Sequence, residues 1–193
     1  HNCLVGSEMC IRDRIMVSGS YNQLGKDEVK KIKKWVEEGN TLITVAGGSS
    51  WAISKKLINE SLVESKKDST HSRKNYVDAS EFIGRERIGG VILKADIDLT
   101  HPIAFGYNDN SIPVYKNNNV FINKTKNDYS SVATYSKDFH IDGYISETNR
   151  EDFIPGSASI IISKVGSGRV VVFADNPNFR GTWSGTNKLF LNA

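Results

Sequence analysis

Cysteine is nearly absent from this chain of 193 residues. The two cysteines, Cys3 and Cys10, both fall among the first fourteen residues, so residues 15–193 contain none. Without cysteine a chain cannot build a disulfide framework, a thiolate zinc site or a cysteine nucleophile. These three kinds of chemistry are therefore excluded from residues 15–193.

Long apolar runs and a strong excess of one charge are also missing. No run approaches the roughly 18–20 apolar residues of a membrane-spanning helix, and no basic segment followed by an apolar stretch marks a signal peptide. Lysines cluster at residues 30–34 and 66–67, but acidic residues are interspersed and the net charge is only +3. Such clusters are typical of solvated faces and do not indicate nucleic acid as a partner. With 38% hydrophobic and 24% charged residues, the composition indicates an ordinary globular domain.

Histidine is scarce, and its spacing does not suit a metal site. No histidine has a glutamate three positions later, so neither an H-x-x-E pair nor an H-E-x-x-H motif is present. The acidic pairs Asp96/Asp98 and Glu81/Glu86 lie in polar stretches and do not indicate a dedicated acid–base pair. We therefore expect no metal and no cofactor in this chain. The four histidines are His1, His71, His101, which precedes a proline and favours a turn or capping role, and His140.

The first fourteen residues differ in character from the rest. The run from Leu4 to Arg14, LVGSEMCIRDR, resembles one reading frame of a sequencing adapter, and such segments are left out of fold reasoning. We therefore expect residues 1–14 to be an artefact and residues 15–193 to form the domain, incomplete at both ends. A genuine N-terminal segment is the alternative.

Strands and helices alternate in the first part of the domain. Short β-branched runs at residues 15–20 and 41–45 predict strands. Residues 26–38 place apolar side chains on one face, which predicts an amphipathic helix with Gly39 just beyond its end. Strand, helix, strand and helix with short connections predict a parallel βαβ unit.

The second half of the chain is richer in strand signals. Its clearest feature is a hairpin, with apolar runs at residues 158–165 and 169–174 joined by Gly-Ser-Gly. The fold class is therefore predicted as α/β: a Rossmann-like or flavodoxin-like parallel sheet with flanking helices and a β-rich insertion. Other expected elements are a polar loop at 66–80, strands at 88–95, 114–115 and 120–122 around an Asn-rich turn, strands or loops at 131–135 and 141–145, and a helix from Thr186.

Two segments follow predicted strands, which is where ligands bind in open α/β sheets. The first is the strand-to-helix turn at residues 46–50, AGGSS. Such a turn carries the nucleophile of α/β hydrolases, but Ser49 lacks the G-x-S-x-G context. Alternatively, the glycines form a tight turn and Ser49 or Ser50 caps a helix that runs to about Asn59, or the amides at the helix start bind an anion. The candidate binding residues in this turn are Gly47, Gly48 and Ser49.

The second segment is residues 175–181, DNPNFRG, after the last predicted strand. It places Asp175, Asn176, Asn178 and Arg180 within six residues. These side chains suit a binding site, for which Asp175, Asn176 and Arg180 are the candidates. They equally suit a self-bonded loop, with Asx-turns from the Asn and Asp side chains and an ion pair from Arg180.

Three stretches carry a resemblance to a known family: residues 39–48 (GNTLITVAGG), 99–107 (LTHPIAFGY) and 173–192, which begins FADNPNFRGTW. They resemble the C-terminal region of large, secreted, zinc-carboxypeptidase-like proteins of the M14 peptidase family. In that family the region is a class I glutamine-amidotransferase-like domain that follows the peptidase domain. The resemblance covers most of residues 15–193. It implies an N-terminally truncated domain, a periplasmic or secreted location, and zinc held only in a peptidase domain that this chain lacks.

The resemblance also implies that the catalytic triad is lost. Active class I amidotransferases read roughly G-x-C-A-G at the turn and H-P-E at the end of a late strand. Here Ala46 stands at the cysteine position, Asn176 at the histidine position and Asn178 at the glutamate position. Alanine has no nucleophile, and neutral asparagine cannot act as the base that activates one. No catalytic residue is therefore expected in this chain.

The expected function is that of a non-catalytic accessory domain of a secreted M14-like zinc carboxypeptidase. It would pack on the upstream peptidase domain of the same chain or help to bind a peptide or cell-wall-type ligand near residues 175–180. One alternative is a hydrolase or amidotransferase-like enzyme that uses Ser49. Another is a small-molecule or sugar-binding module, which a pocket between the two strand-end loops would favour.

Overall fold

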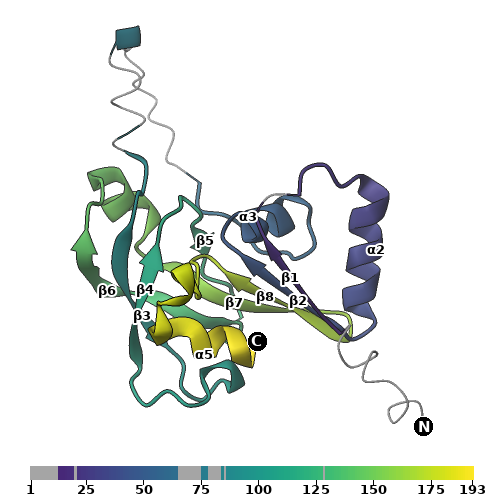
Figure 1. Ribbon diagram of the computed structural model, residues 1–193. Coiled ribbons are helices and arrows are strands. Elements are labelled where there is room, and N and C mark those ends of the chain that lie inside the picture. Colours follow the sequence, from purple (N-terminus) through teal and green to yellow (C-terminus); the bar gives the residue numbers. More distant parts are fainter. Residues whose placement is uncertain (1–12, 20, 65–74, 78–83, 85, 128) are drawn as a thin grey trace.

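Strands with buried faces assemble the chain around one mixed sheet (Figure 1). The computed structural model describes residues 13–19, 21–64, 75–77, 84, 86–127 and 129–193. Within these residues eight strands join in the order β1-β2-β8-β7-β6-β3-β4, and β5 pairs with β7. The strands are β1 (Arg14–Ser18), β2 (Thr41–Val45), β3 (Val91–Ile97), β4 (Ser111–Lys116), β5 (Ile122–Asn123), β6 (Ser131–Gly143), β7 (Ser157–Val165) and β8 (Gly168–Phe173). The helices are α2 (Lys26–Glu37), α3 (Gly47–Ser54) and α5 (Ser184–Asn192), with short helical turns η2 (Pro102–Ala104), η3 (Asn149–Phe153) and η4 (Phe179–Gly181).

The predicted βαβ unit is confirmed. β1 and β2 are parallel, α2 connects them, and α3 follows β2 directly. Gly39 follows α2 with φ 118°, the left-handed region that favours glycine after a helix. β8 then pairs in parallel with β2, so that Val45 lies beside Phe173. The carboxyl ends of β2 and β8 therefore meet at the same edge of the sheet.

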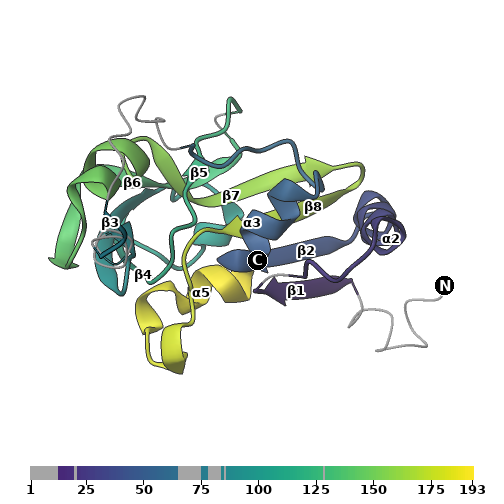
Figure 2. The same ribbon diagram turned by 90° about the horizontal axis from the view of Figure 1, so that it is seen from above.

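Helices cover both faces of the parallel strands (Figure 2). Alternate residues of β2 face opposite ways. Leu42 packs in a cluster with residues of α2 and α3, whereas Ile43 packs with Leu189 of α5. This arrangement confirms the α/β fold class with flanking helices.

The remaining strands are antiparallel and form the predicted β-rich part. The predicted β7–β8 hairpin is confirmed, and its register runs from Val165 beside Gly168 to Ile160 beside Phe173. The two uncertain segments at 131–135 and 141–145 belong to one long strand, β6, which ends at Gly143. The strands next to the Asn-rich turn do not pair with each other, because β4 pairs with β3 and β5 pairs with β7.

The predicted bounds of α3 are wrong at both ends. The helix begins at Gly47, with Ala46 as its N-cap residue, and no side chain caps it. It ends at Ser54, well before Asn59. His101 does cap η2 as expected, since its Nδ1 accepts a hydrogen bond from the Ile103 amide at 3.2 Å.

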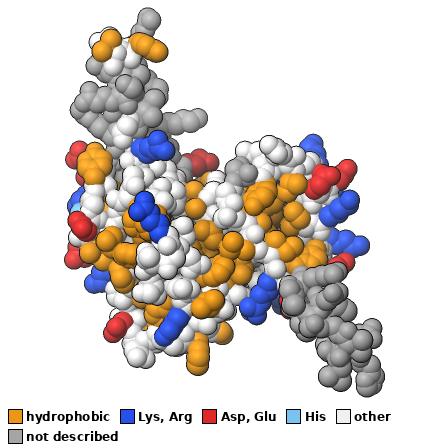
Figure 3. Space-filling view, in the orientation of Figure 1, with side chains coloured by type: hydrophobic (Ala, Val, Ile, Leu, Met, Phe, Trp, Pro, Cys, Tyr) orange, Lys and Arg blue, Asp and Glu red, His pale blue; other side chains and the backbone are white. Residues whose placement is uncertain are grey.

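The surface carries charged side chains of both signs, as the small net charge of the sequence indicates. On the face shown in Figure 3, basic and acidic side chains are scattered among hydrophobic ones and form no single patch. No helix in the described part of the chain is long and apolar enough to cross a membrane. Most of the predicted loop at 66–80 lies outside the described residues, as do Cys3, Cys10, His1, His71 and Glu81.

Candidate functional site

Ala46 forms a strained turn at the carboxyl edge of the parallel strands. Its φ of 50° and ψ of −112° lie outside the regions that residues with a Cβ ordinarily adopt. Its amide donates to the Phe173 carbonyl at 2.9 Å, which fixes the turn against the end of β8. Such a conformation costs about 1–3 kcal/mol and persists only where its surroundings hold it. This is the strained strand-to-helix geometry that presents a nucleophile in α/β enzymes, but here it presents a methyl group.

The two glycines after Ala46 have different surroundings. A Cβ on Gly48 would lie 2.4 Å from the Val17 carbonyl oxygen and 3.0 Å from the Val17 carbonyl carbon. A Cβ on Gly47 would come no closer than 3.4 Å to the backbone of Gly19. Gly48 is therefore required because α3 packs directly against the backbone of β1. Its candidate role in ligand binding has no support in this geometry.

Ser49 cannot serve as an exposed nucleophile. Its side chain is fully buried, its hydroxyl donates to the Phe173 carbonyl at 2.8 Å, and the hydroxyl oxygen lies 3.0 Å from Thr44 Oγ1. Because α3 begins at Gly47, Ser49 lies in the first turn facing the sheet. The structure thus contradicts two expectations for Ser49, the exposed nucleophile and the helix cap, and it gives no support to a ligand-binding role.

Asp175 belongs to a buried ionic cluster that joins four strands and their ends. Its carboxylate accepts hydrogen bonds from Tyr135 of β6 at 2.8 Å and from Ser159 of β7 at 2.6 Å. Lys116, at the end of β4, lies 3.2 Å away, and its side chain is completely buried. The ammonium also donates to the Val120 carbonyl at 2.7 Å. Internal contacts therefore occupy the Asp175 carboxylate, and they give no support to its predicted role in ligand binding.

Burial shifts the titration of this cluster. Desolvation lowers the pKa of the Lys116 ammonium, and the neighbouring Asp175 carboxylate opposes that shift. Burial raises the pKa of the Tyr135 phenol well above its ordinary value of 10.0, and the Asp175 charge raises it further. Tyr135 therefore stays protonated and donates to the carboxylate. The ammonium also lies over the Phe121 ring, 4.7 Å from its centroid.

The loop after β8 is largely self-bonded. Asn176 forms the predicted Asx-turn, since its Oδ1 accepts from the Asn178 amide at 3.0 Å. Among the described residues, Arg180 does not form the expected ion pair, and the nearby Asp175 pairs with Lys116. Instead, Arg180 is exposed with φ 53°, and its guanidinium lies 5.3 Å from the centroid of the Phe179 ring.

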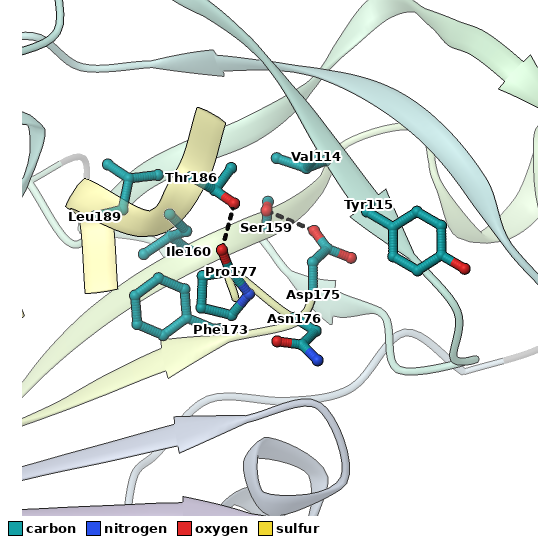
Figure 4. Close-up of a pocket in the computed structure, with 10 residues that line it drawn as sticks. All are labelled: Val114, Tyr115, Ser159, Ile160, Phe173, Asp175, Asn176, Pro177, Thr186 and Leu189. Atoms are coloured by element: carbon teal, nitrogen blue, oxygen red, sulfur yellow. Dashed lines mark hydrogen bonds between the residues drawn. The ribbon is translucent and has the colours of Figure 1, made fainter. Parts of the chain in front are cut away.

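The cavity beside these residues is too small for a ligand. It has a volume of about 10 Å³ and is lined by residues of β4, β7, the loop after β8 and α5, including Asp175, Asn176 and Thr186. A space of that size holds about one water molecule. Figure 4 shows Asp175 pointing toward Ser159 and Asn176 pointing away from both. The pocket that would favour a binding module between the strand-end loops is therefore not formed at this place.

The structure brings together some of the predicted residues and adds others. Ala46 and the segment leading to Asn176 and Asn178 do meet at one edge of the sheet, because β2 and β8 are parallel and in register. Lys116 and Tyr135 were missed, and they occupy the centre of the cluster. Within the described residues, no group of three or more His, Cys, Asp or Glu side chains is arranged to hold a metal ion.

These features define a class of protein: an α/β domain in which the parallel strand β2 ends in a strained strand-to-helix turn that carries alanine. No protein-family model and no curated protein matches the sequence. Among solved structures, a protein described as a GMP synthase subunit, from Thermoplasma acidophilum, shares 15% identity over 93% of this chain and 70% of its own, with a TM-score of 0.48. A cytoplasmic protein of Salmonella typhimurium shares 16% identity over 93% of this chain and 69% of its own, with a TM-score of 0.47. PurLQS from Thermotoga maritima shares 14% identity over 85% of this chain and 65% of its own, also with a TM-score of 0.47. Because the identities and TM-scores are this low, the similarity to these structures does not indicate a function for this chain.

Proposed function

We propose that this chain is a non-catalytic accessory domain with a class I glutamine-amidotransferase-like fold. One observation carries the proposal: the strained turn keeps its geometry at Ala46, but the side chain there is a methyl group. A nucleophile needs a hydroxyl, thiol, amine or carboxylate with a base within hydrogen-bond reach. The nearby hydroxyl of Ser49 is buried and bonded to the Phe173 carbonyl. The neutral amides of Asn176 and Asn178 supply no base.

The proposed parent is a secreted, M14-like zinc carboxypeptidase. The support is the sequence resemblance in residues 39–48, 99–107 and 173–192. On this proposal the partner is the peptidase domain of the same chain, which would hold the zinc, and the location is periplasmic or extracellular. The accessory role would be to stabilise that domain or to contribute to binding a peptide or cell-wall-type ligand.

Deletion of the domain from the full-length parent protein tests this role. We expect the truncated protein to lose soluble secretion or peptidase activity, because an exposed domain interface destabilises the partner. The matched control keeps the domain but carries Ser184→Ala, which removes one exposed hydroxyl at the start of α5 and should retain full activity. A truncated parent that folds, is secreted and cleaves peptides at the wild-type rate would rule the accessory role out.

Thiol labelling should distinguish position 46, where the nucleophile is replaced by alanine, from the buried position 49. In a background with Cys3→Ser and Cys10→Ser, we expect Ala46→Cys to react with a thiol reagent under native conditions, because Ala46 is half-buried at the turn. The control, Ser49→Cys, should react only after unfolding, since that position is fully buried. Equal labelling of both in the native state would contradict the geometry. Hydrolysis of glutamine by the unmodified chain would contradict its non-catalytic character.

Replacing Ala46 with glycine should stabilise the fold by about 1 kcal/mol. The substitution removes backbone strain of about 1–3 kcal/mol, and the greater freedom of glycine in the unfolded chain offsets about 0.4–1 kcal/mol of that gain. Urea unfolding followed by circular dichroism measures the change. Ala52→Gly in the same helix is the control, because Ala52 has ordinary helical geometry and should lose stability. Destabilisation of both variants to the same extent would show that the turn is not strained.

A further inference from the structure

A groove lies at the end of the sheet opposite Ala46. Its volume is about 410 Å³, and it is lined by α2, the segment after α3, the loop between β5 and β6, and the end of β7. The turn of the β7–β8 hairpin lies beside the end of α2 (Figure 1), where the Ser167 amide donates to the Glu37 carbonyl at 2.9 Å. Small-molecule sites typically have volumes of about 300–1,000 Å³. The groove is therefore large enough for a small molecule, whereas the cavity beside Asp175 is not.

The groove is partly lined by polar side chains that form no hydrogen bond or ion pair with other described residues. The side chains of Lys33, Asn59, Ser130 and Lys164 line it, and none of them has a hydrogen bond or ion pair with another described residue. Glu60 accepts one hydrogen bond, from Ser163 at 2.8 Å. A carboxylate has about four acceptor positions, so most of its capacity remains available. Hydrogen-bond donors and acceptors that are available to a ligand therefore line the same groove.

The charge balance and the apolar lining of the groove indicate which class of ligand it could bind. Two lysines and two glutamates line it, so their formal charges cancel, which disfavours a polyanion such as a nucleotide. Its apolar lining comes from Val165, which is half-buried, and from the small exposed parts of Leu57 and Ile58. A neutral ring with hydroxyl groups on its rim and C–H bonds on its face matches that combination. We propose that this groove binds a neutral saccharide.

Saccharide binding at the groove would give the proposed accessory domain a ligand. The role of such binding in the parent protein rests on the proposed function, but the binding itself can be measured without it. Binding at the groove and the vacated turn at Ala46 are independent, because they lie at opposite ends of the parallel strands. Failure of sugar binding would leave the thiol-labelling result for Ala46 unchanged. Failure of the accessory role would likewise leave sugar binding measurable in the isolated chain.

Titration with cellobiose, maltose and diacetylchitobiose, followed by ¹H–¹⁵N NMR, tests the proposal. We expect at least one disaccharide, at concentrations up to about 10 mM, to shift amide signals of groove residues such as Asn59 and Ser163. The double variant Asn59→Ala/Ser130→Ala, with both changes on the groove wall, should bind at least about tenfold more weakly. Ser184→Ala, at the exposed start of α5 and outside the groove, is the control and should bind like the wild type. The proposal is overturned if no disaccharide shifts the groove signals, or if the double variant binds as tightly as the control.

Discussion

Replacing Lys116 with methionine is expected to lower the free energy of unfolding by about 3–5 kcal/mol, because it leaves a buried carboxylate without its counter-charge. The Lys116 side chain is 0% exposed, and its ammonium lies 3.2 Å from Asp175. Methionine has similar length but cannot donate to Asp175 or to the Val120 carbonyl, which accepts from the ammonium at 2.7 Å. Domains of this kind are stable by only about 5–15 kcal/mol, so the loss should be large in urea unfolding curves.

A matched control separates the ion pair from a general effect of losing a lysine. Lys137 on β6 is exposed, and Lys137→Met should change stability by no more than about 0.5 kcal/mol. The double variant Lys116→Met/Asp175→Asn removes both charges and should lose less than the sum of the two single variants. If Lys116→Met and Lys137→Met unfold at the same urea concentration, or if the single effects simply add, the cluster does not stabilise the fold as described.

The parallel part of the fold was readable from the sequence because its signals are local. A helix with one apolar face and a glycine just after it requires no knowledge of distant residues, and α2 with Gly39 matched that expectation. The hairpin of β7 and β8 was equally plain, with two apolar runs around a short turn. β6 was harder. Its pairings with β3 and β7 contain register shifts, which interrupt the alternation of buried and exposed residues along the strand.

The candidate site was predictable only in part, because its decisive contacts are long-range. The turn at Ala46 and the Asx-turn at Asn176 follow from short segments, and both are present. The partner of Asp175 lies 59 residues away on β4. One signal could have found it: Ile112, Val114 and Lys116 alternate with more exposed residues, which places the lysine on the buried face of an expected strand. A lysine in that position needs a carboxylate nearby.

The fate of Ser49 depended on where the helix begins. With a serine as the cap, the hydroxyl would have faced the helix amides. Because Ala46 takes the cap position instead, Ser49 enters the first turn and its hydroxyl turns to the end of β8. A shift of a few residues in a helix boundary thus changes a candidate nucleophile into a core contact. Boundaries of this kind are the least reliable part of sequence-based expectations.

Gly48→Ala is expected to lower the free energy of unfolding by about 2–4 kcal/mol, because overpacking against a rigid neighbour is among the costliest kinds of substitution. The added methyl would lie 2.4 Å from the Val17 carbonyl oxygen. That oxygen belongs to the backbone of β1, which is paired with β2, so it cannot move aside as the end of a flexible side chain could. To relieve the clash, α3 would have to lift from the sheet and expose Trp51, which is 2% exposed in the native fold.

Gly47→Ala is the matched control, and unlike Gly48→Ala it should not lower the stability of the fold. A Cβ on Gly47 meets the backbone of Gly19 at 3.4 Å, an ordinary contact. Alanine is favoured over glycine in a helix by about 0.5–1 kcal/mol, so Gly47→Ala should be neutral or slightly stabilising in the same urea measurement. Equal effects of the two substitutions would contradict the close packing of α3 on β1. A loss of stability in Gly48→Ala alone would assign Gly48 to that contact.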